Sequence, residues 1–211
     1  MTFVLTYSSL VTSIQQYCER QDQRFIASIP TFIMLGQRRV CRDLKILQTK
    51  VFVNGTLTTG QSILNKPGNW LNTSSFQIGT GTDFNTTVLL ESRSYAYGTY
   101  YWPDATQTAQ PKYYSDEDIN SFQLYPTPDQ NYPYQLVYFQ LPPLLDETTG
   151  TNVLTSTIPD VLLFACLAET ASFLKDDDRI PMWEARYAEY SKAISDEDLR
   201  RIYDGFTIRG S

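Results

Sequence analysis

The sequence predicts an α+β fold: a four-helix body with a further short C-terminal helix, and an antiparallel β-sandwich or barrel lobe inserted between the second and third helices. Apolar residues recur at helical spacing near both ends of the chain, whereas apolar and polar residues alternate in its middle. Gly, Asn, Pro and Thr separate the alternating runs, as is typical of short strands joined by turns. We therefore assign 1–45 and 155–211 to a helical body and 46–154 to an inserted β domain.

Two helices are expected before the β domain. The first spans about Thr6–Glu19, where Leu10 and Ile14 lie on one face. The second spans about Pro30–Leu44 and contains Gly36 in its interior. Because glycine costs about 1 kcal/mol relative to alanine inside a helix, Gly36 indicates the close approach of another helix.

The C-terminal half of the second helix is basic, with Arg38, Arg39 and Arg42 close together. Cations suit this end of a helix because they interact favourably with its dipole. The cluster has two interpretations. In the first, the arginines form a solvated basic face. In the second, Arg39 or Arg42 forms an ion pair with a carboxylate, which belongs either to the later helices, such as Glu169, or to a neighbouring subunit.

The β region is expected to hold about six short antiparallel strands between Ile46 and Leu141. Asn54 and Gly55 both tolerate positive φ angles, so this pair predicts a tight hairpin turn. Pro126–Asp129 separates two alternating runs and predicts a second turn. The chain contains 15 tyrosines, a residue type that suits both pleated sheets and contact faces.

A third helix is predicted to start at Thr157, which is a candidate N-cap, with Pro159 in the first turn. The run Val161–Ala168 is apolar on every side of a helix, which predicts burial on every side. The three cysteines lie among apolar neighbours in predicted helices and are expected to be buried free thiols.

The fourth helix is predicted to start near Pro181, with an apolar stripe at spacings of four, three and four: Trp183, Tyr187, Tyr190 and Ile194. Ser195 and Asp198 then have capping-box spacing, which predicts a separate short helix over Glu197–Asp204.

Composition argues against several functional classes. Seventeen basic and 23 acidic residues give a net charge of −6. An acidic chain is not expected to bind nucleic acid by charge. An acidic surface instead suits the wall of a passage through which DNA slides without sticking. The chain has no histidine, the commonest general base and zinc ligand, and we expect no catalytic, metal or cofactor site. No apolar run approaches the roughly 20 residues that span a membrane.

Several motifs, taken in order, resemble those of tailed-phage head–tail adaptor proteins, also called neck or connector proteins. The related proteins of short-tailed phages are the tail tubular proteins of the gatekeeper ring. The matching segments are Ile29–Ile33, Arg38–Leu44, Lys66–Leu71, Pro111–Tyr114, Leu124–Asp129, Pro159–Leu163, Ala168–Glu169, Phe173–Leu174, and Trp183 with Tyr187.

This resemblance implies a structural virion protein that is not an enzyme. Family members form a ring, usually of twelve copies, below the portal in the neck of the virion, after assembly in the host cytoplasm. The ring extends the DNA channel for genome packaging and ejection and offers a docking platform to the tail. The implied partners are the portal protein, neighbouring copies of the chain, a tail or second neck protein, and passing DNA without sequence-specific binding; no membrane is implied.

The resemblance also implies that the C-terminal segment docks into the portal, and this segment is basic and apolar in an otherwise acidic chain; the alternative is a frayed terminus. The docking candidates are Arg200, Arg201, Ile202, Tyr203, Phe206, Ile208 and Arg209. Aromatic residues of the β domain are expected to face the tail, and the alternative is a carbohydrate-binding module in which they stack on sugar rings together with Tyr95 and Tyr97. These candidates are Tyr100, Tyr101, Trp102, Tyr113 and Tyr114.

Overall fold

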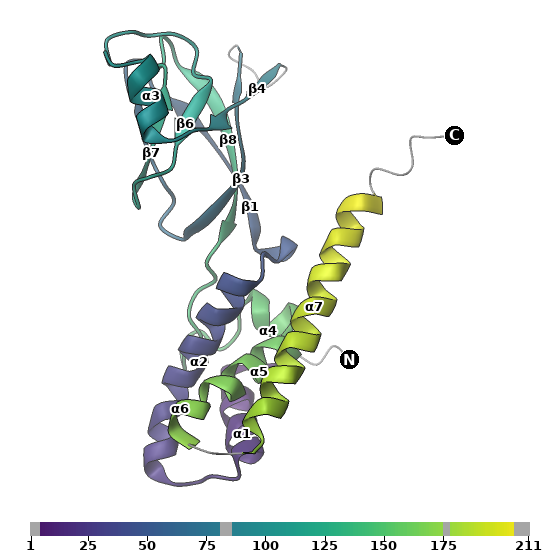
Figure 1. Ribbon diagram of the computed structural model, residues 1–211. Coiled ribbons are helices and arrows are strands. Elements are labelled where there is room, and N and C mark those ends of the chain that lie inside the picture. Colours follow the sequence, from purple (N-terminus) through teal and green to yellow (C-terminus); the bar gives the residue numbers. More distant parts are fainter. Residues whose placement is uncertain (1–4, 81–85, 175–177, 205–211) are drawn as a thin grey trace. The chain divides into compact units, whose positions relative to one another are not determined.

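The computed structural model describes residues 5–80, 86–174 and 178–204 (Figure 1). The fold is mixed α+β, as predicted, and the chain separates into two compact units. One unit contains the residues up to Thr49 together with those from Pro142 onward, and the other contains Lys50–Leu141. The second unit is shorter than the range 46–154 predicted for the insertion.

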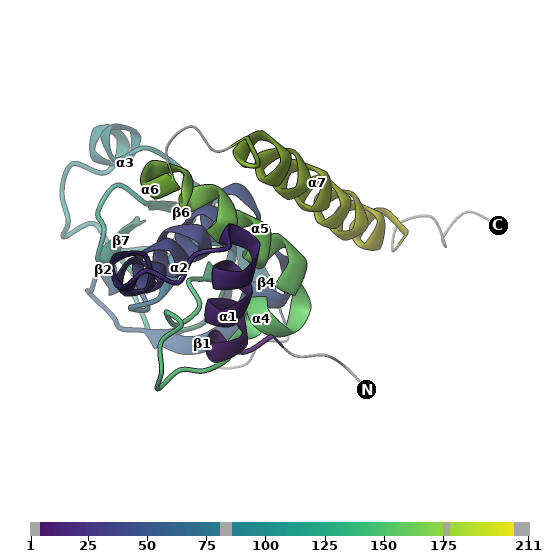
Figure 2. The ribbon, with the colours of Figure 1, turned by 90° about the horizontal axis from the view of Figure 1, so that it is seen from below.

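The first unit is helical. Its elements are α1 (Tyr7–Cys18), α2 (Gln23–Asp43), the 3-10 helix η1 (Leu47–Thr49), α4 (Val153–Thr157), α5 (Pro159–Glu169), α6 (Ala171–Leu174) and α7 (Ile180–Asp204). The helix α5 contacts α1, α2, α4, α6 and α7. Figure 2 shows α5 between α1 and α7. The predicted burial of its apolar run on every side is confirmed in part, because Leu163 and Phe164 are only half-buried.

The second helix begins at Gln23, seven residues before the predicted start at Pro30. Asp22 is the N-cap, and its carboxylate accepts a hydrogen bond of 3.0 Å from the backbone N–H of Phe25. Proline inside a helix removes a donor and costs about 3 kcal/mol. The cap and the complete burial of Phe25 and Ile29 on the turns before Pro30 compensate for this cost.

The predicted N-cap of the third helix was also wrong. Thr157 is the last residue of α4, a short helix that Asn152 caps by accepting hydrogen bonds from the N–H groups of Leu154 and Thr155. Ile158 separates the two helices, and Pro159 is the first residue of α5. An extra helical turn therefore precedes the predicted helix, because Asn152 provides an earlier cap.

The segment before α4 belongs to the helical unit through the buried side chain of Gln37. Its Nε2 donates hydrogen bonds to the carbonyl groups of Pro142 and Pro143, at 3.2 and 2.8 Å, and its Oε1 accepts one of 3.1 Å from the N–H of Leu145. Hydrogen bonds from a buried side-chain amide to a neighbouring segment hold that segment in place. The helical unit therefore begins again at Pro142.

The predicted break at Ser195 is absent, and α7 is one continuous helix. The Ser195 hydroxyl donates a hydrogen bond of 3.0 Å to the carbonyl of Ser191, one turn earlier, instead of capping a new helix. The predicted stripe is present in part. Trp183 and Tyr187 are buried, whereas Tyr190 is half-buried and lies 5.6 Å from Phe164, measured between ring centroids.

The second unit contains two sheets of four strands each, with strand orders β1-β8-β3-β4 and β2-β7-β6-β5. The strands are β1 (Lys50–Leu57), β2 (Ile63–Asn65), β3 (Trp70–Gly79), β4 (Thr87–Leu89), β5 (Glu91–Ser92), β6 (Tyr113–Ser115), β7 (Ser121–Tyr125) and β8 (Tyr132–Gln140). The described pairs are antiparallel except β5 with β6, which is parallel, so the prediction of about six purely antiparallel strands was incomplete.

Both sheets contribute side chains to one hydrophobic core. Its buried members are Leu57, Phe76, Ile78, Leu90, Tyr114, Phe122, Leu124, Tyr132, Leu136 and Tyr138. At the edge of this core Lys66 is buried, with Nζ 4.0 Å from the ring centroid of Trp70 and in an ion pair with Asp116.

Asn54 and Gly55 do not form the predicted turn. Both lie within β1, where they pair with Gln135 and Tyr134 of β8. A Cβ atom on Gly55 would lie 2.6 Å from the Tyr134 ring, so glycine is required here because an aromatic ring packs on the backbone. The predicted turn at Pro126–Asp129 does separate β7 from β8.

The glycine within α2 confirms the predicted close helix approach. A Cβ atom built on Gly36 would lie 2.8 Å from both the backbone nitrogen and the Sγ of Cys166 in α5. The described cysteines are free and buried, as expected. Burial raises the pKa of the Cys41 thiol to about 11.

Replacing Gly36 by alanine is expected to lower the free energy of unfolding by about 1–3 kcal/mol, as for other overpacked cores. The added methyl group meets backbone atoms of α5, and this clash outweighs the roughly 1 kcal/mol by which alanine favours a helix. Chemical denaturation measures the change. The matched control is Gly150→Ala in the same unit, where a Cβ would meet nothing within 4 Å. Equal stabilities of the two variants would contradict the tight contact.

Candidate interaction surfaces

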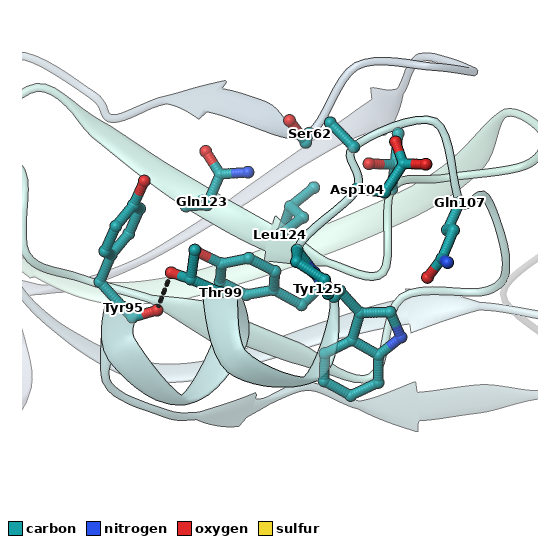
Figure 3. Close-up of a pocket in the computed structure, with 12 residues that line it drawn as sticks. Ser62, Tyr95, Thr99, Asp104, Gln107, Gln123, Leu124 and Tyr125 are labelled. Carbon is teal, nitrogen blue, oxygen red and sulfur yellow. Dashed lines mark hydrogen bonds between the residues drawn. The ribbon is translucent and has the colours of Figure 1, made fainter.

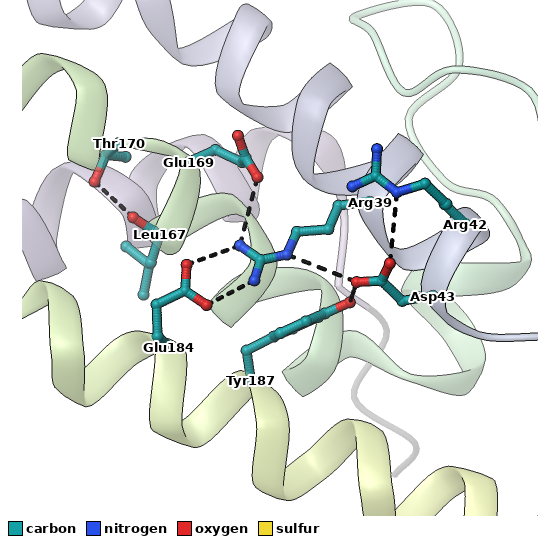
Figure 4. A network of polar contacts seen from close by, with 8 residues as sticks. All are labelled: Arg39, Arg42, Asp43, Leu167, Glu169, Thr170, Glu184 and Tyr187. Atoms are coloured by element: carbon teal, nitrogen blue, oxygen red, sulfur yellow. Dashed lines mark hydrogen bonds and ion pairs between the residues drawn. The ribbon is translucent and has the colours of Figure 1, made fainter.

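Arg39 of α2 joins three helices (Figure 4). Its guanidinium forms two parallel hydrogen bonds to the Glu184 carboxylate of α7, Nη1 to Oε1 at 2.9 Å and Nη2 to Oε2 at 2.6 Å. Nη1 also lies 3.5 Å from Oε1 of Glu169 in α5. Arg39 and Glu169 were predicted from the sequence as ion-pair candidates. Glu184, which lies next to the apolar stripe of α7, was not predicted.

Tyr187 and Asp43 extend this arrangement. The Arg39 guanidinium lies 4.4 Å from the ring centroid of Tyr187, and the Tyr187 hydroxyl donates a hydrogen bond of 2.8 Å to Asp43. Burial, together with this hydrogen bond to a carboxylate, raises the pKa of Tyr187 to about 12. The hydrogen bond to Glu184 raises the pKa of Arg39 further above its ordinary value, so both groups keep their protons near neutral pH.

The other two arginines of the predicted basic cluster face outward. Arg42 lies 3.5 Å from Asp43, but 76% of its side chain is exposed. Arg38 is exposed, and the described part of the chain provides no ion pair for it. The cluster therefore divides into Arg39, which holds helices of the same chain together, and Arg38 with Arg42, which are accessible to another molecule.

The C-terminal half of α7 buries no side chain between Ala188 and Arg201. In Figure 2 its last turns extend past the other helices of the unit. Asp198 accepts a hydrogen bond of 3.1 Å from the N–H of Leu47, and Arg201 pairs with Glu197 along the helix. An exposed helix of this kind gains little stability from packing within its own chain.

Some of the predicted docking residues lie on α7, and the others follow its end. Arg200 and Arg201 are exposed on the helix, and Ile202 and Tyr203 continue it. Phe206, Ile208 and Arg209 lie outside the described residues. The segment predicted as a separate C-terminal helix is therefore the end of a long helix.

The tyrosine-rich segment expected in the β domain forms a helix, α3 (Tyr95–Tyr101). Ser94 caps it by accepting a hydrogen bond from the Tyr97 N–H, and the Glu117 carboxylate accepts one of 2.6 Å from the Tyr95 N–H. Gly98 packs against the Tyr125 ring, where a Cβ would approach to 2.2 Å. The two hydrogen bonds at its N-terminus, which no alternating pattern reveals, favour the helix, and Gly98 lets it pack on the sheet.

The aromatic candidates differ in exposure. Tyr100 and Tyr101 are 79% and 56% exposed, and Trp102 and Tyr113 are half-buried with ring centroids 5.6 Å apart. Tyr114 is 7% exposed and belongs to the hydrophobic core, so the prediction that it faces the tail was wrong. Strand alternation explains the difference, because Tyr113 and Tyr114 are neighbours in β6 and point to opposite faces.

A cavity of about 240 Å³ lies beside α3 (Figure 3). Leu124 and Tyr125 of β7 line it together with Tyr95 and Thr99 of α3. The polar side chains of Asp104, Gln107 and Gln123 lie around it. No group of three or more His, Cys, Asp or Glu residues that suits a metal ion occurs among the residues the structure describes. Nor does any described helix combine the length and apolar character needed to cross a membrane.

A family model described as SU10 adaptor protein matches residues 5–208. The chain belongs to this family. It is thus a phage adaptor protein, a class that interacts with other phage head and tail proteins and is found in the virion. Membership also indicates a structural rather than a catalytic role. No curated protein matches the chain.

For an SU10 adaptor, the surfaces that matter are those that contact other proteins. The family match confirms the resemblance to phage adaptor proteins that the motifs suggested. The accessible surfaces described above are the exposed end of α7, the pair Arg38 and Arg42, and the aromatic residues around α3.

Replacing Arg39 by lysine is expected to destabilise the adaptor by about 1–3 kcal/mol. Lysine keeps the positive charge but cannot form two parallel hydrogen bonds to Glu184 while also contacting Glu169. Chemical denaturation measures the change. The matched control is Arg42→Lys, at an exposed position, with an expected effect below about 0.5 kcal/mol. Similar losses in both variants would show that the paired hydrogen bonds contribute nothing specific.

The raised pKa of Tyr187 predicts a loss of stability at alkaline pH. The unfolded chain ionises this phenol near pH 10, whereas the folded state keeps it neutral to about pH 12. Its contribution is therefore complete below pH 10 and is lost as the pH rises toward about 12. We expect the free energy of unfolding of Tyr187→Phe to fall less steeply between about pH 9.5 and 11.5 than that of the unchanged protein. Parallel pH profiles would contradict the assigned pKa.

Proposed function

We propose that copies of this adaptor form a ring in the neck, below the portal. Such rings usually contain twelve copies. The ring extends the DNA channel and offers a docking platform to the tail. The observation that carries the proposal is the long exposed end of α7 in a member of an adaptor family. A helix that continues for several turns without burying a side chain suits a position against another protein.

The exposed basic residues of this end are candidates for the portal contact. Arg200 and Arg201 are exposed basic residues in a chain whose net charge is −6. The family match continues to Ile208, so the predicted docking segment belongs almost entirely to the matched range. Arg38 and Arg42, which are exposed on α2, are candidates for contacts between neighbouring copies of the ring.

The net charge also supports a DNA channel. Repeating a charge of −6 around a ring produces a negative field that repels phosphate groups. DNA then passes without binding, in either direction, during packaging and ejection. The exposed tyrosines of α3, with Trp102 and Tyr113, are candidates for the tail platform because Tyr and Trp are enriched at protein interfaces.

Deleting Arg200–Ser211 is expected to abolish assembly on the portal while the chain stays folded. The buried anchors of α7, Trp183 and Tyr187, precede the deletion and are retained. Electron microscopy of the portal protein of the same phage, mixed with the full or the truncated chain, measures assembly. A second ring stacked on the narrow end of the portal is expected only with the full chain.

A double charge reversal separates loss of charge from loss of length, with a single reversal elsewhere on α7 as the control. The double variant Arg200→Glu with Arg201→Glu should weaken the ring assembly, whereas Lys192→Glu, also exposed on α7, should not. Unchanged portal binding by the truncated chain contradicts the docking role of the segment. A bare portal, with the full chain bound to tail components instead, places the protein further down the tail, as in the tail tubular proteins.

A further inference from the structure

A groove runs between α3 and one face of the β2-β7-β6-β5 sheet. Besides the cavity of Figure 3, a second cavity of about 270 Å³ lies here, and both are lined by Tyr95 and Gln123. The first cavity extends to Trp102 and Asp104, and the second extends to Glu117 and Asp118. Two hollows that share a pair of lining residues form one elongated site.

The walls of the groove are held in place by contacts within the β unit. Gly98 lets α3 lie directly on the Tyr125 ring, and the Thr99 hydroxyl donates a hydrogen bond of 2.6 Å to the Tyr95 carbonyl. Trp102 stacks on Tyr125 with ring centroids 6.4 Å apart and planes inclined by 27°. A site whose side chains are positioned in this way binds at a lower entropic cost.

Both ends of the groove are acidic. Asp104 lies at one end and Asp118 with Glu117 at the other. No lysine or arginine lines either cavity, but the Lys66 ammonium donates a hydrogen bond to the Asp118 carbonyl beside the second, so the Asp104 end is the one without a neighbouring cation. A hydrogen bond from the Thr106 hydroxyl lowers the pKa of Asp104, and one from the Ser121 hydroxyl lowers the pKa of Asp118. Both carboxylates are therefore ionised at neutral pH, which favours a cationic ligand and disfavours phosphate groups.

Aromatic rings accompany the carboxylates. Tyr95 is 51% exposed at the centre of the groove, and Trp102 lines the end that contains Asp104. Trp102 is half-buried, and a carboxylate next to a partly exposed aromatic ring suits a guanidinium or ammonium group, which forms an ion pair with the first and a cation–π contact with the second. The groove therefore has the chemistry of a receptor for arginine or lysine side chains.

The middle of the groove offers hydrogen bonds to a polypeptide backbone. Gln123 is half-buried, and its amide has no hydrogen-bond partner among the described residues. A side-chain amide both donates and accepts, as a peptide group does. An elongated groove with such a group between two acidic ends matches an extended chain better than a compact ligand.

We propose that this groove docks an extended segment of a tail protein, whose arginine or lysine side chain packs on Trp102 and pairs with Asp104. The inference rests on the proposed function in one respect: the partner is the tail component that the adaptor platform receives. It adds the location of the contact and the chemistry of the partner segment. A glycan lacks the positive charge that both acidic ends favour, and DNA is repelled by them.

The test uses the full-length adaptor and fluorescein-labelled overlapping peptides from the tail proteins of the same phage. We expect a subset of basic peptides to bind, and their binding to weaken about tenfold or more when Asp104→Lys reverses the charge. Asp104→Asn, which keeps an acceptor for the Thr106 hydrogen bonds, should weaken binding less. Peptides with glutamine in place of lysine and arginine should not bind.

The matched controls are Glu147→Lys and Glu147→Gln, which make the same charge changes at an exposed position of the helical unit. These controls should bind the peptides as the unchanged protein does, and thermal unfolding should show that all four variants are folded. Equal binding by Asp104→Lys and Glu147→Lys, binding of the glutamine peptides, or no peptide binding at all overturns the inference. Binding of neutral oligosaccharides that Asp104→Asn leaves unchanged overturns it in favour of a glycan site.

The portal assembly assay separates this inference from the proposed function. Asp104→Lys should still form rings on the portal, because the groove belongs to the β unit and the proposed portal contact to α7. If the unchanged adaptor fails to join the portal but binds basic peptides through Asp104, the ring proposal fails and the groove stands. If rings form but no peptide binds, the groove inference alone fails.

Discussion

Within the helical unit one cation, Arg39, links α7 to α2 and α5 through its guanidinium. Its hydrogen bonds to Glu184 and its contact with the Tyr187 ring act on the same turns of α7. Beyond Tyr187 no side chain up to Arg201 is buried, so the exposed end of the helix is positioned by the anchored part. The direction in which the adaptor presents this end therefore follows mainly from these anchors, together with the hydrogen bond that Asp198 accepts from the Leu47 N–H.

Close packing sets the second constraint. Gly36 brings α2 against the backbone of α5 at Cys166, and an apolar helix in this position needs neighbours on every side. Both features were predictable, because an all-round apolar run and a glycine in a helix interior each have a direct physical meaning. The pairing of Arg39 with Glu184 was not predictable from periodicity, since a glutamate beside an apolar stripe looks like any solvated residue.

In three of the wrong predictions, a residue or segment suited to one local role took another role in the folded chain. Ser195 has N-cap chemistry but bonds to a carbonyl one turn earlier, and the helix continues. Gly55 has turn chemistry but lies in a strand under the Tyr134 ring. The segment at Tyr95 has strand propensity, yet a cap from Ser94 and a distant carboxylate, Glu117, make it helical. Contacts between distant segments decided the cases of Gly55 and Tyr95, whereas Ser195 was decided within its own helix.

The two proposed contact regions differ in charge and in the backbone conformation that they use. The end of α7 presents Arg200 and Arg201 on a helix, whereas the groove beside α3 is acidic and suits an extended chain. Opposite charges on one chain create a risk that copies bind one another through the wrong surfaces. The helical conformation of α7 opposes this, because side chains on a helix rise only about 1.5 Å per residue, against more than 3 Å in an extended segment. Backbone conformation thus adds a selectivity that charge alone does not provide.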